Sequence, residues 1–218
     1  TKNPEEKPYF LTNQSAGSFN TFKHSFEAGT GKFLNNLLSV SARYSIINSD
    51  GYIDRAFSKL NSYNINALFE KGNTKLRFLT FGGKEKTYQA WNGIDKATYE
   101  SNPKFNYSGA IYDANWENII GFYDNETDNY RQNHYHLLWE QKLGKIWNLE
   151  TTFHLTHGEG YYENYKQDAK FSKYDLPNIV ENGNTITRTD FIRKKWLDND
   201  FYGVVSNLYG NFENLNLN

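Results

Sequence analysis

The stretch Leu38-Ser39-Val40-Ser41-Ala42-Arg43-Tyr44-Ser45-Ile46 decides the fold class of this chain. Apolar residues and tyrosine occupy every second position, and serine and arginine occupy the positions between them. Successive side chains of a β-strand point to opposite faces, so this alternation predicts a strand with one apolar and one polar face. Phe22–Ala28 and Leu149–Leu155 repeat the pattern, and no segment shows a sustained helical period.

Along the whole chain the same pattern predicts about eight long strands joined as an antiparallel meander, an all-β fold. Short turns that contain glycine or asparagine separate several of the strands. We expect strands at about residues 8–17, 20–31, 37–48, 57–70, 74–90, 130–143, 147–160 and 194–213.

The connections between these strands are of two kinds. Short ones lie at 32–36, 71–73 and 144–146, and long ones run over about 91–129 and 161–193. Short turns at one end and long loops at the other are typical of outer-membrane β-barrels, with the long loops outside the cell. A soluble β-sandwich more often has loops of moderate length at both ends.

The composition excludes several other classes of protein. The 218 residues carry a formal net charge of −1, which gives no support for nucleic-acid binding, and the chain has no cysteine for disulfides or thiolate metal sites. No apolar run is long enough for a membrane helix. Aromatic residues make up 17% of a polar chain, which is typical of a soluble β-rich binding domain or of a barrel with aromatic girdles. Methionine is absent even at position 1, so we expect a processed chain or a piece of a longer one.

None of the motifs that suggest chemistry is convincing. His134 and His136 share one face of a strand and have a spacing that can hold a metal, but polar residues facing a barrel lumen explain them better. Asp124–Asn129 lacks the glycine and the final glutamate of a calcium loop. Gly82–Gly83 and Gly158–Gly160 do not lie between a strand and a helix, as a phosphate-binding loop requires. We therefore expect no catalytic residues, no metal ligands and no cofactor.

Several stretches resemble, in the same order along the chain, the TonB-dependent outer-membrane receptors of the ferric-siderophore and ferric-citrate-like branch. TKNP resembles the end of the internal plug domain. The other stretches resemble the first barrel hairpin, the strand after the third outer loop, the exit of the following strand, and the next descending strand. They are SAGSFNTFKHSFEAGTGKF (15–33), YDNETDNYRQNHYHLLWEQ (123–141), HLTHGEGYYENYK (154–166) and DFIRKKWLDNDFYG (190–203).

The resemblance implies a 22-stranded barrel with a plug, of which this chain supplies a part. Residues 1–7 would end the plug and its linker, and residues 8–218 would form about the first eight barrel strands. The implied protein lies in the cell outer membrane and imports a ferric siderophore or similar chelate. It contacts TonB only through parts absent from this chain. Since a free sheet edge is costly in lipid, we expect an isolated segment to cover its apolar face, for example by dimerising.

An anionic ferric chelate favours a basic and aromatic vestibule formed by the loops and the upper lumen. The candidates are the basic, tyrosine, glutamine and tryptophan residues that flank the two long loops. The predicted ligand-binding residues are Lys84, Lys86, Tyr88, Gln89, Trp91, Arg131, Arg193 and Trp196. For each of them the alternative is a lumen-lining basic residue or an interface tryptophan. Trp139 and Trp147 lie beside a short turn and are expected in the periplasmic aromatic girdle.

Two other functions compete with a receptor. A soluble envelope β-sandwich that binds carbohydrate would explain the aromatic content, and it would fold without detergent. An outer-membrane barrel enzyme would require a serine–histidine or acid-pair constellation, which the sequence does not show.

Overall fold

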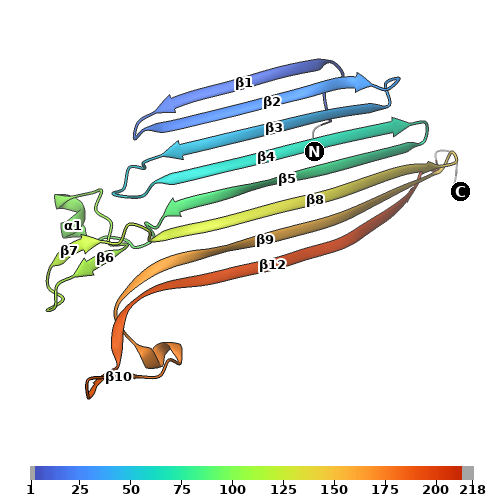
Figure 1. Cartoon of the computed structure of the whole chain (residues 1–218). Helices are drawn as coiled ribbons and strands as arrows, with labels where there is room; N and C mark the ends of the chain where they lie inside the picture. Colours follow the sequence, from blue (N-terminus) through green and yellow to red (C-terminus); the bar gives the residue numbers. More distant parts are fainter. Residues whose placement is uncertain (1–2, 213–218) are drawn as a thin grey trace, which may run out of the picture.

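The computed structural model describes residues 3–212, and it consists chiefly of one eight-stranded antiparallel sheet (Figure 1). Each strand pairs with the next long strand along the sequence, so the sheet is a simple meander. The strands in their order across the sheet are β1 (Pro8–Gly17), β2 (Thr21–Phe33), β3 (Leu38–Ser49), β4 (Ser58–Lys71), β5 (Thr74–Tyr88), β8 (Thr127–Leu143), β9 (Trp147–Lys170) and β12 (Arg188–Gly210).

The two longest connections contain small elements of their own. The loop after β5 holds α1 (Lys96–Ser101) and the short hairpin of β6 (Ala110–Tyr112) and β7 (Ile119–Phe122). The loop after β9 holds η1 (Phe171–Tyr174) and the hairpin of β10 (Ile179–Glu181) and β11 (Asn184–Ile186). Figure 1 shows both loops projecting from the same end of the sheet.

The predicted all-β meander of eight long strands is therefore confirmed, and two boundaries are corrected. The predicted long connection at 161–193 is about half long strand, because β9 continues to Lys170 and β12 begins at Arg188. The polar side chains of this extension follow no apolar alternation, but the backbone ladder continues through them. The predicted end of the last strand at 213 and the first two residues of the plug-like segment lie outside the described residues.

Turn chemistry explains the end of the sheet opposite the long loops. Gly72 (φ +58°) and Gly144 (φ +67°) take the left-handed conformation that tight hairpins require, and Asn35 and Asn36 do the same between β2 and β3. The long connections all leave the other end of the sheet. The predicted separation of short turns from long loops is thus confirmed.

The sheet has one apolar and one polar face, set by the alternation along each strand. On β3, Val40 and Tyr44 belong to the apolar face and Ser41 and Arg43 to the polar face. The antiparallel register extends the apolar face across the neighbouring strands. One row across it is Val40, Ala67, Phe78, Leu137, Phe153 and Val204, and the next is Ala42, Ile65, Thr80, Tyr135, Leu155 and Tyr202.

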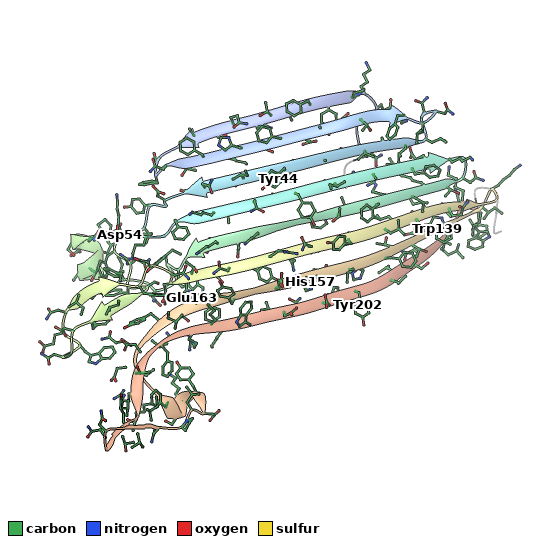
Figure 2. All side chains as sticks on the ribbon, viewed as in Figure 1. Tyr44, Asp54, Trp139, His157, Glu163 and Tyr202 are labelled. Carbon is green, nitrogen blue, oxygen red and sulfur yellow. The ribbon has the colours of Figure 1, made fainter. Side chains whose placement is uncertain are left out.

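Aromatic residues mark both limits of the apolar face along the strands. Toward the long loops, Tyr63 and Tyr135 are followed by polar residues of the same face on β4 and β8, and Tyr44 of β3 is the direct partner of Tyr63. Toward the short turns, Trp139 and Trp147 lie on this face near the end of the sheet. Figure 2 shows Tyr44, Trp139 and Tyr202 at well-separated places on the sheet.

This architecture has almost no interior of its own. Within residues 3–212 the buried apolar side chains are Leu68, Leu79, Tyr88 and Phe171, whereas Phe78, Leu137 and many others stay more than a third exposed. A β-sandwich requires a second sheet packed on the first, and the described residues contain none on either face of this sheet. The sandwich alternative is therefore not favoured. The described residues also contain no helix with the length and apolarity needed to cross a membrane.

Candidate functional site

The long loop at 89–126 is fixed to the rim of the sheet by buried polar side chains. Asn106, which is 1% exposed, donates from Nδ2 to the carbonyl oxygens of Asp54 (3.1 Å) and Gln89 (2.9 Å). Its Oδ1 atom accepts from the backbone N–H of Ser108 (3.0 Å). One amide thus joins the middle of the loop to Gln89, the residue directly after β5, and to the connection between β3 and β4.

A second group of polar residues joins the end of β5 to β9 and β12. The Nδ2 atom of Asn164 donates to Oε1 of Gln89 (2.8 Å) and to Oε1 of Glu126 (2.9 Å), and all three side chains are buried. Arg193 Nη2 donates to Asn164 Oδ1 (2.8 Å). These contacts join three strands at the rim through buried amides and a carboxylate, and buried hydrogen bonds of this kind stabilise the structure when their partners are present.

Tyr88, the last residue of β5, and Arg55, in the connection between β3 and β4, also contact the loop. The Tyr88 hydroxyl lies within hydrogen-bond distance of the carbonyl oxygens of Ser108 (3.0 Å) and Tyr123 (2.7 Å) and donates its single proton to one of them at a time. Burial raises the pKa of that hydroxyl. The Arg55 guanidinium lies 3.5 Å from the centre of the Phe122 ring, a cation–π contact. The loop is therefore packed against the rim at both of its ends.

Glu163 of β9 is a carboxylate with three partners above the apolar face. It is 3% exposed and accepts hydrogen bonds from Tyr123 Oη (2.5 Å) and Asn125 Nδ2 (2.6 Å), and Lys194 Nζ lies 3.3 Å away. Burial raises the pKa of Glu163, but the three partners outweigh burial and lower the pKa overall. Burial, together with the hydrogen bond to Glu163, raises the pKa of Tyr123 to about 12.

These two shifts predict how the long loop responds to pH. Because the pKa of Glu163 is lowered, its ionised carboxylate stabilises the packed loop at every pH above the ordinary pKa of a glutamate. This contribution is lost as the pH falls through the lowered pKa. The raised pKa of Tyr123 contributes stability below its ordinary value, which is lost as the pH rises toward about 12. We expect the amide hydrogens of residues 119–126, corrected for intrinsic exchange, to be best protected between these limits. Glu163→Gln should flatten the acid side of the profile, whereas an unchanged acid side would contradict the role of Glu163.

Trp91, Tyr162 and Lys195 form an exposed group near the long loops. The rings of Trp91 and Tyr162 meet edge to face with centroids 5.5 Å apart, and Lys195 Nζ lies 5.6 Å from the Tyr162 ring centre. Tyr162 and Lys195 are cross-strand partners on the polar side of the sheet, and Trp91 is 60% exposed. Asp128 is the partner of Tyr162 on β8, and burial raises the pKa of its carboxyl. This group offers aromatic surface and a cation to a ligand above the polar face.

A hollow of about 410 Å³ lies on the polar face below this group. Gly83 lines it, and a Cβ there would meet the carbonyl oxygen of Asn61 at 2.7 Å, so the close approach of β4 at this position requires glycine. His134 stacks on Phe81 with centroids 4.4 Å apart, and its Nδ1 atom lies 2.8 Å from Thr156 Oγ1. Among residues 3–212 no cluster of histidine and acidic residues could hold a metal ion. His134 thus lies on the polar face, as the partner of Phe81.

The structure divides the eight predicted ligand-binding residues into three groups. Tyr88, Gln89 and Arg193 belong to the rim contacts, and Trp91 is exposed above the polar face. The third group lies on the same side of the sheet as the apolar face, nearer to the long loops. It consists of Lys84, Lys86, Arg131 and Trp196. Contact of any of them with a ligand stays a prediction.

The sequence analysis missed Tyr162 and Lys195 as members of the exposed group. Tyr162 lies in the segment predicted as an outer loop, and Lys195 is the second residue of the strand predicted at 194–213. Strand parity could have shown that Lys195 and Arg193 share a face, had β12 been extended to Arg188. Parity could also have placed Arg131 on the face of Tyr135 and Leu137.

Comparison with known proteins shows a likeness to solved structures. No protein-family model matches the chain, and no curated protein matches it either. The crystal structure of the ferric-catecholate import receptor Fiu of E. coli K12, in its closed form, matches with a TM-score of 0.62 and 12% sequence identity. The match covers 97% of this chain and 30% of that receptor, so the chain spans less than a third of its length. At this identity the likeness concerns the fold, and it shows that the sheet is a partial β-barrel.

Proposed function

We propose that this chain is part of the wall and outer loops of an outer-membrane receptor that imports an iron chelate. The observation that carries the proposal is the two-faced meander with its long loops at one end, which matches a ferric-catecholate import receptor along 97% of the chain. In this proposal residues 1–7 lead from a plug domain and residues 8–218 belong to the barrel. Contact with TonB would lie in parts of the receptor outside this chain.

The chemistry of the two faces supports a place in a membrane. Phe78 and Phe153 lie in a continuous apolar row that no other part of the described chain covers, and lipid is the solvent that such a surface requires. Tyrosines at one limit and Trp139 and Trp147 at the other correspond to aromatic girdles at two interfaces. The predicted periplasmic position of the two tryptophans follows from their place beside the short turns.

The ligand would approach from the long-loop side and meet Trp91, Tyr162, Lys195 and Arg193. Aromatic faces bind planar ligand groups, and the two cations attract a negatively charged chelate. Iron enters already held by its chelator, so the protein needs no metal ligands for this task. We propose no catalytic role, and the expected absence of enzyme activity stays a prediction.

The proposal predicts selective binding of anionic ferric chelates. In the intact protein, a ferric tris-catecholate should quench tryptophan fluorescence at lower concentration than a neutral ferric hydroxamate. Trp91→Ala combined with Lys195→Gln should weaken binding about tenfold, equivalent to ~1.4 kcal/mol, because a ring contact and a charge are lost. The titration should be followed by filter binding of ⁵⁵Fe as well, since both this variant and its control remove a tryptophan.

Matched controls exist in the same loop. Trp116→Ala with Lys96→Gln removes the same residue types from positions outside the exposed group, where Trp116 is 53% exposed and stacks on Tyr112. We expect this variant to bind as the unmodified protein does. Equal losses in both variants would contradict the site at Trp91 and Lys195. Failure of every ferric chelate to bind would contradict the receptor proposal itself.

A further inference from the structure

Four cations lie just beyond the apolar face, toward the long loops. They come from three adjacent strands, β4, β5 and β8, and have the strand parity of the apolar face. Asn61, Lys84 and Arg131 form the first row of residues beyond the one that holds Tyr63. The row after it holds Lys59 and Lys86. We call Lys59, Lys84, Lys86 and Arg131 the cationic patch.

The register places these cations in two like-charge pairs. Lys59 is the direct cross-strand partner of Lys86, and Lys84 is the direct partner of Arg131. Directly opposed residues in an antiparallel sheet have Cβ atoms about 4.5–5.5 Å apart, and like charges there are destabilising. Two such pairs side by side favour a bound anion that offsets the repulsion.

The described chain supplies little negative charge to the cationic patch. Arg131 Nη1 lies 3.8 Å from Glu159 Oε1, yet the arginine side chain remains 56% exposed. Lys86 Nζ donates to the amide oxygen of Asn125 (2.8 Å), which is neutral, and Lys59 Nζ lies 5.4 Å from the ring centre of Phe57. Among residues 3–212, Lys84 has no ion pair. The neighbours of the four cations on this side of the sheet include neutral asparagines, which supply no negative charge. They are Asn48, Asn61, Asn129 and Asn133.

We propose that the cationic patch binds the phosphate of a lipid headgroup in the membrane leaflet on the long-loop side. This inference rests on the membrane placement proposed above. Basic side chains directly beyond an apolar face and its tyrosines lie at headgroup level, where their charges attract anionic lipids. Below them, Ile65, Phe78 and Leu137 are each about two-fifths exposed and offer a surface to the acyl chains.

The neighbouring strands show that the patch is local. At the same level on β9 and β12 the outward residues include Glu159, Asp198 and Asp200, and His157 Nδ1 lies 2.8 Å from Asp200 Oδ1. An anionic headgroup would be repelled there. The lipid phosphate therefore belongs on β4, β5 and β8.

Native mass spectrometry of the intact protein in neutral detergent tests the inference. The probes are dioleoylphosphatidic acid, dioleoylglycerol with the same chains but no phosphate, and inorganic phosphate with no chains. We expect phosphatidic acid to bind more tightly than either fragment. Lys84→Gln with Arg131→Gln should weaken it about 10- to 30-fold, since each basic group near an anionic headgroup contributes on the order of a tenfold change in affinity or somewhat less. Lys84→Arg with Arg131→Lys keeps both charges and should retain binding.

A matched control lies on the other face of the sheet. Lys23→Gln with Arg43→Gln removes the same two charges from polar-face positions of β2 and β3, and it should leave lipid binding unchanged. Equal weakening in both double variants, or equal binding of inorganic phosphate and phosphatidic acid, would overturn the inference. Flotation of the protein with phosphatidylcholine vesicles tests the membrane placement by itself. If the protein enters these vesicles but binds phosphatidic acid no better than dioleoylglycerol, the proposed function stands and the proposed lipid site at the cationic patch is wrong.

Discussion

Phe153→Arg should lower the free energy of unfolding by about 2–4 kcal/mol in a bilayer, the cost of an arginine at the depth of the lipid core. Phe153 lies in the middle of the apolar face, between Leu137 of β8 and Val204 of β12, and is 43% exposed. Urea unfolding of the intact protein in phosphatidylcholine vesicles, followed by heat-modifiable migration on gels, would measure the loss.

The adjacent residue provides the control. Thr152 points to the polar face, so Thr152→Arg adds the same side chain where water or polar residues can solvate it. We expect a change of less than about 1 kcal/mol, as for other substitutions on the lumen side of a barrel. If both variants unfolded at the same urea concentration, the assignment of lipid to the apolar face would be wrong.

The sheet could be predicted from the sequence because its main signal is local. The alternation over Leu38–Ile46 fixes both the strand and its two faces, and each short turn fixes the pairing of the strands beside it. The same reasoning predicts that Tyr135 and Leu137 share a face. It would have separated Lys84 and Arg131 from the vestibule candidates, had parity been applied to them as well.

The polar extension of β9 and β12 could not be predicted in this way. Between Tyr161 and Lys170 the chain leaves the apolar face, so neither side of the strand needs apolar residues. The ladder there continues through backbone pairing and side-chain contacts such as Arg193 to Asn164. A signal based on hydrophobic periodicity ends where the apolar environment ends, although the strand does not.

The contacts that anchor the long loop could also not be predicted from the sequence. Asn106 bonds to backbone atoms of Asp54 and Gln89, and Asn164 reaches Gln89 across 75 positions of sequence. An asparagine in a loop is common, and only the fold shows that this one is 1% exposed. Gln89 is predicted as a ligand contact, and the structure shows its side chain buried within the rim, so this contact stays a prediction.

Asn106→Ala should release the long loop while leaving the sheet intact. The change leaves the N–H of Ser108 and two carbonyl oxygens without their partners, and a buried group left unsatisfied costs about 1–3 kcal/mol. We expect the loop to open more easily by about 2–3 kcal/mol. Cleavage within residues 89–126 would then be roughly 30- to 150-fold faster when proteolysis follows the open population.

Two further variants separate the role of the amide from a general effect on the loop. Asn106→Asp keeps an acceptor for Ser108 but cannot donate to Asp54 and Gln89, so it should also speed cleavage. Asn115→Ala changes an exposed asparagine of the same loop and should leave the rate unchanged. Unchanged cleavage in Asn106→Ala would mean that the contacts of Tyr88 and Glu163 hold the loop without it. Faster cleavage confined to the two Asn106 variants would show that one buried amide controls access to the loop side of the sheet.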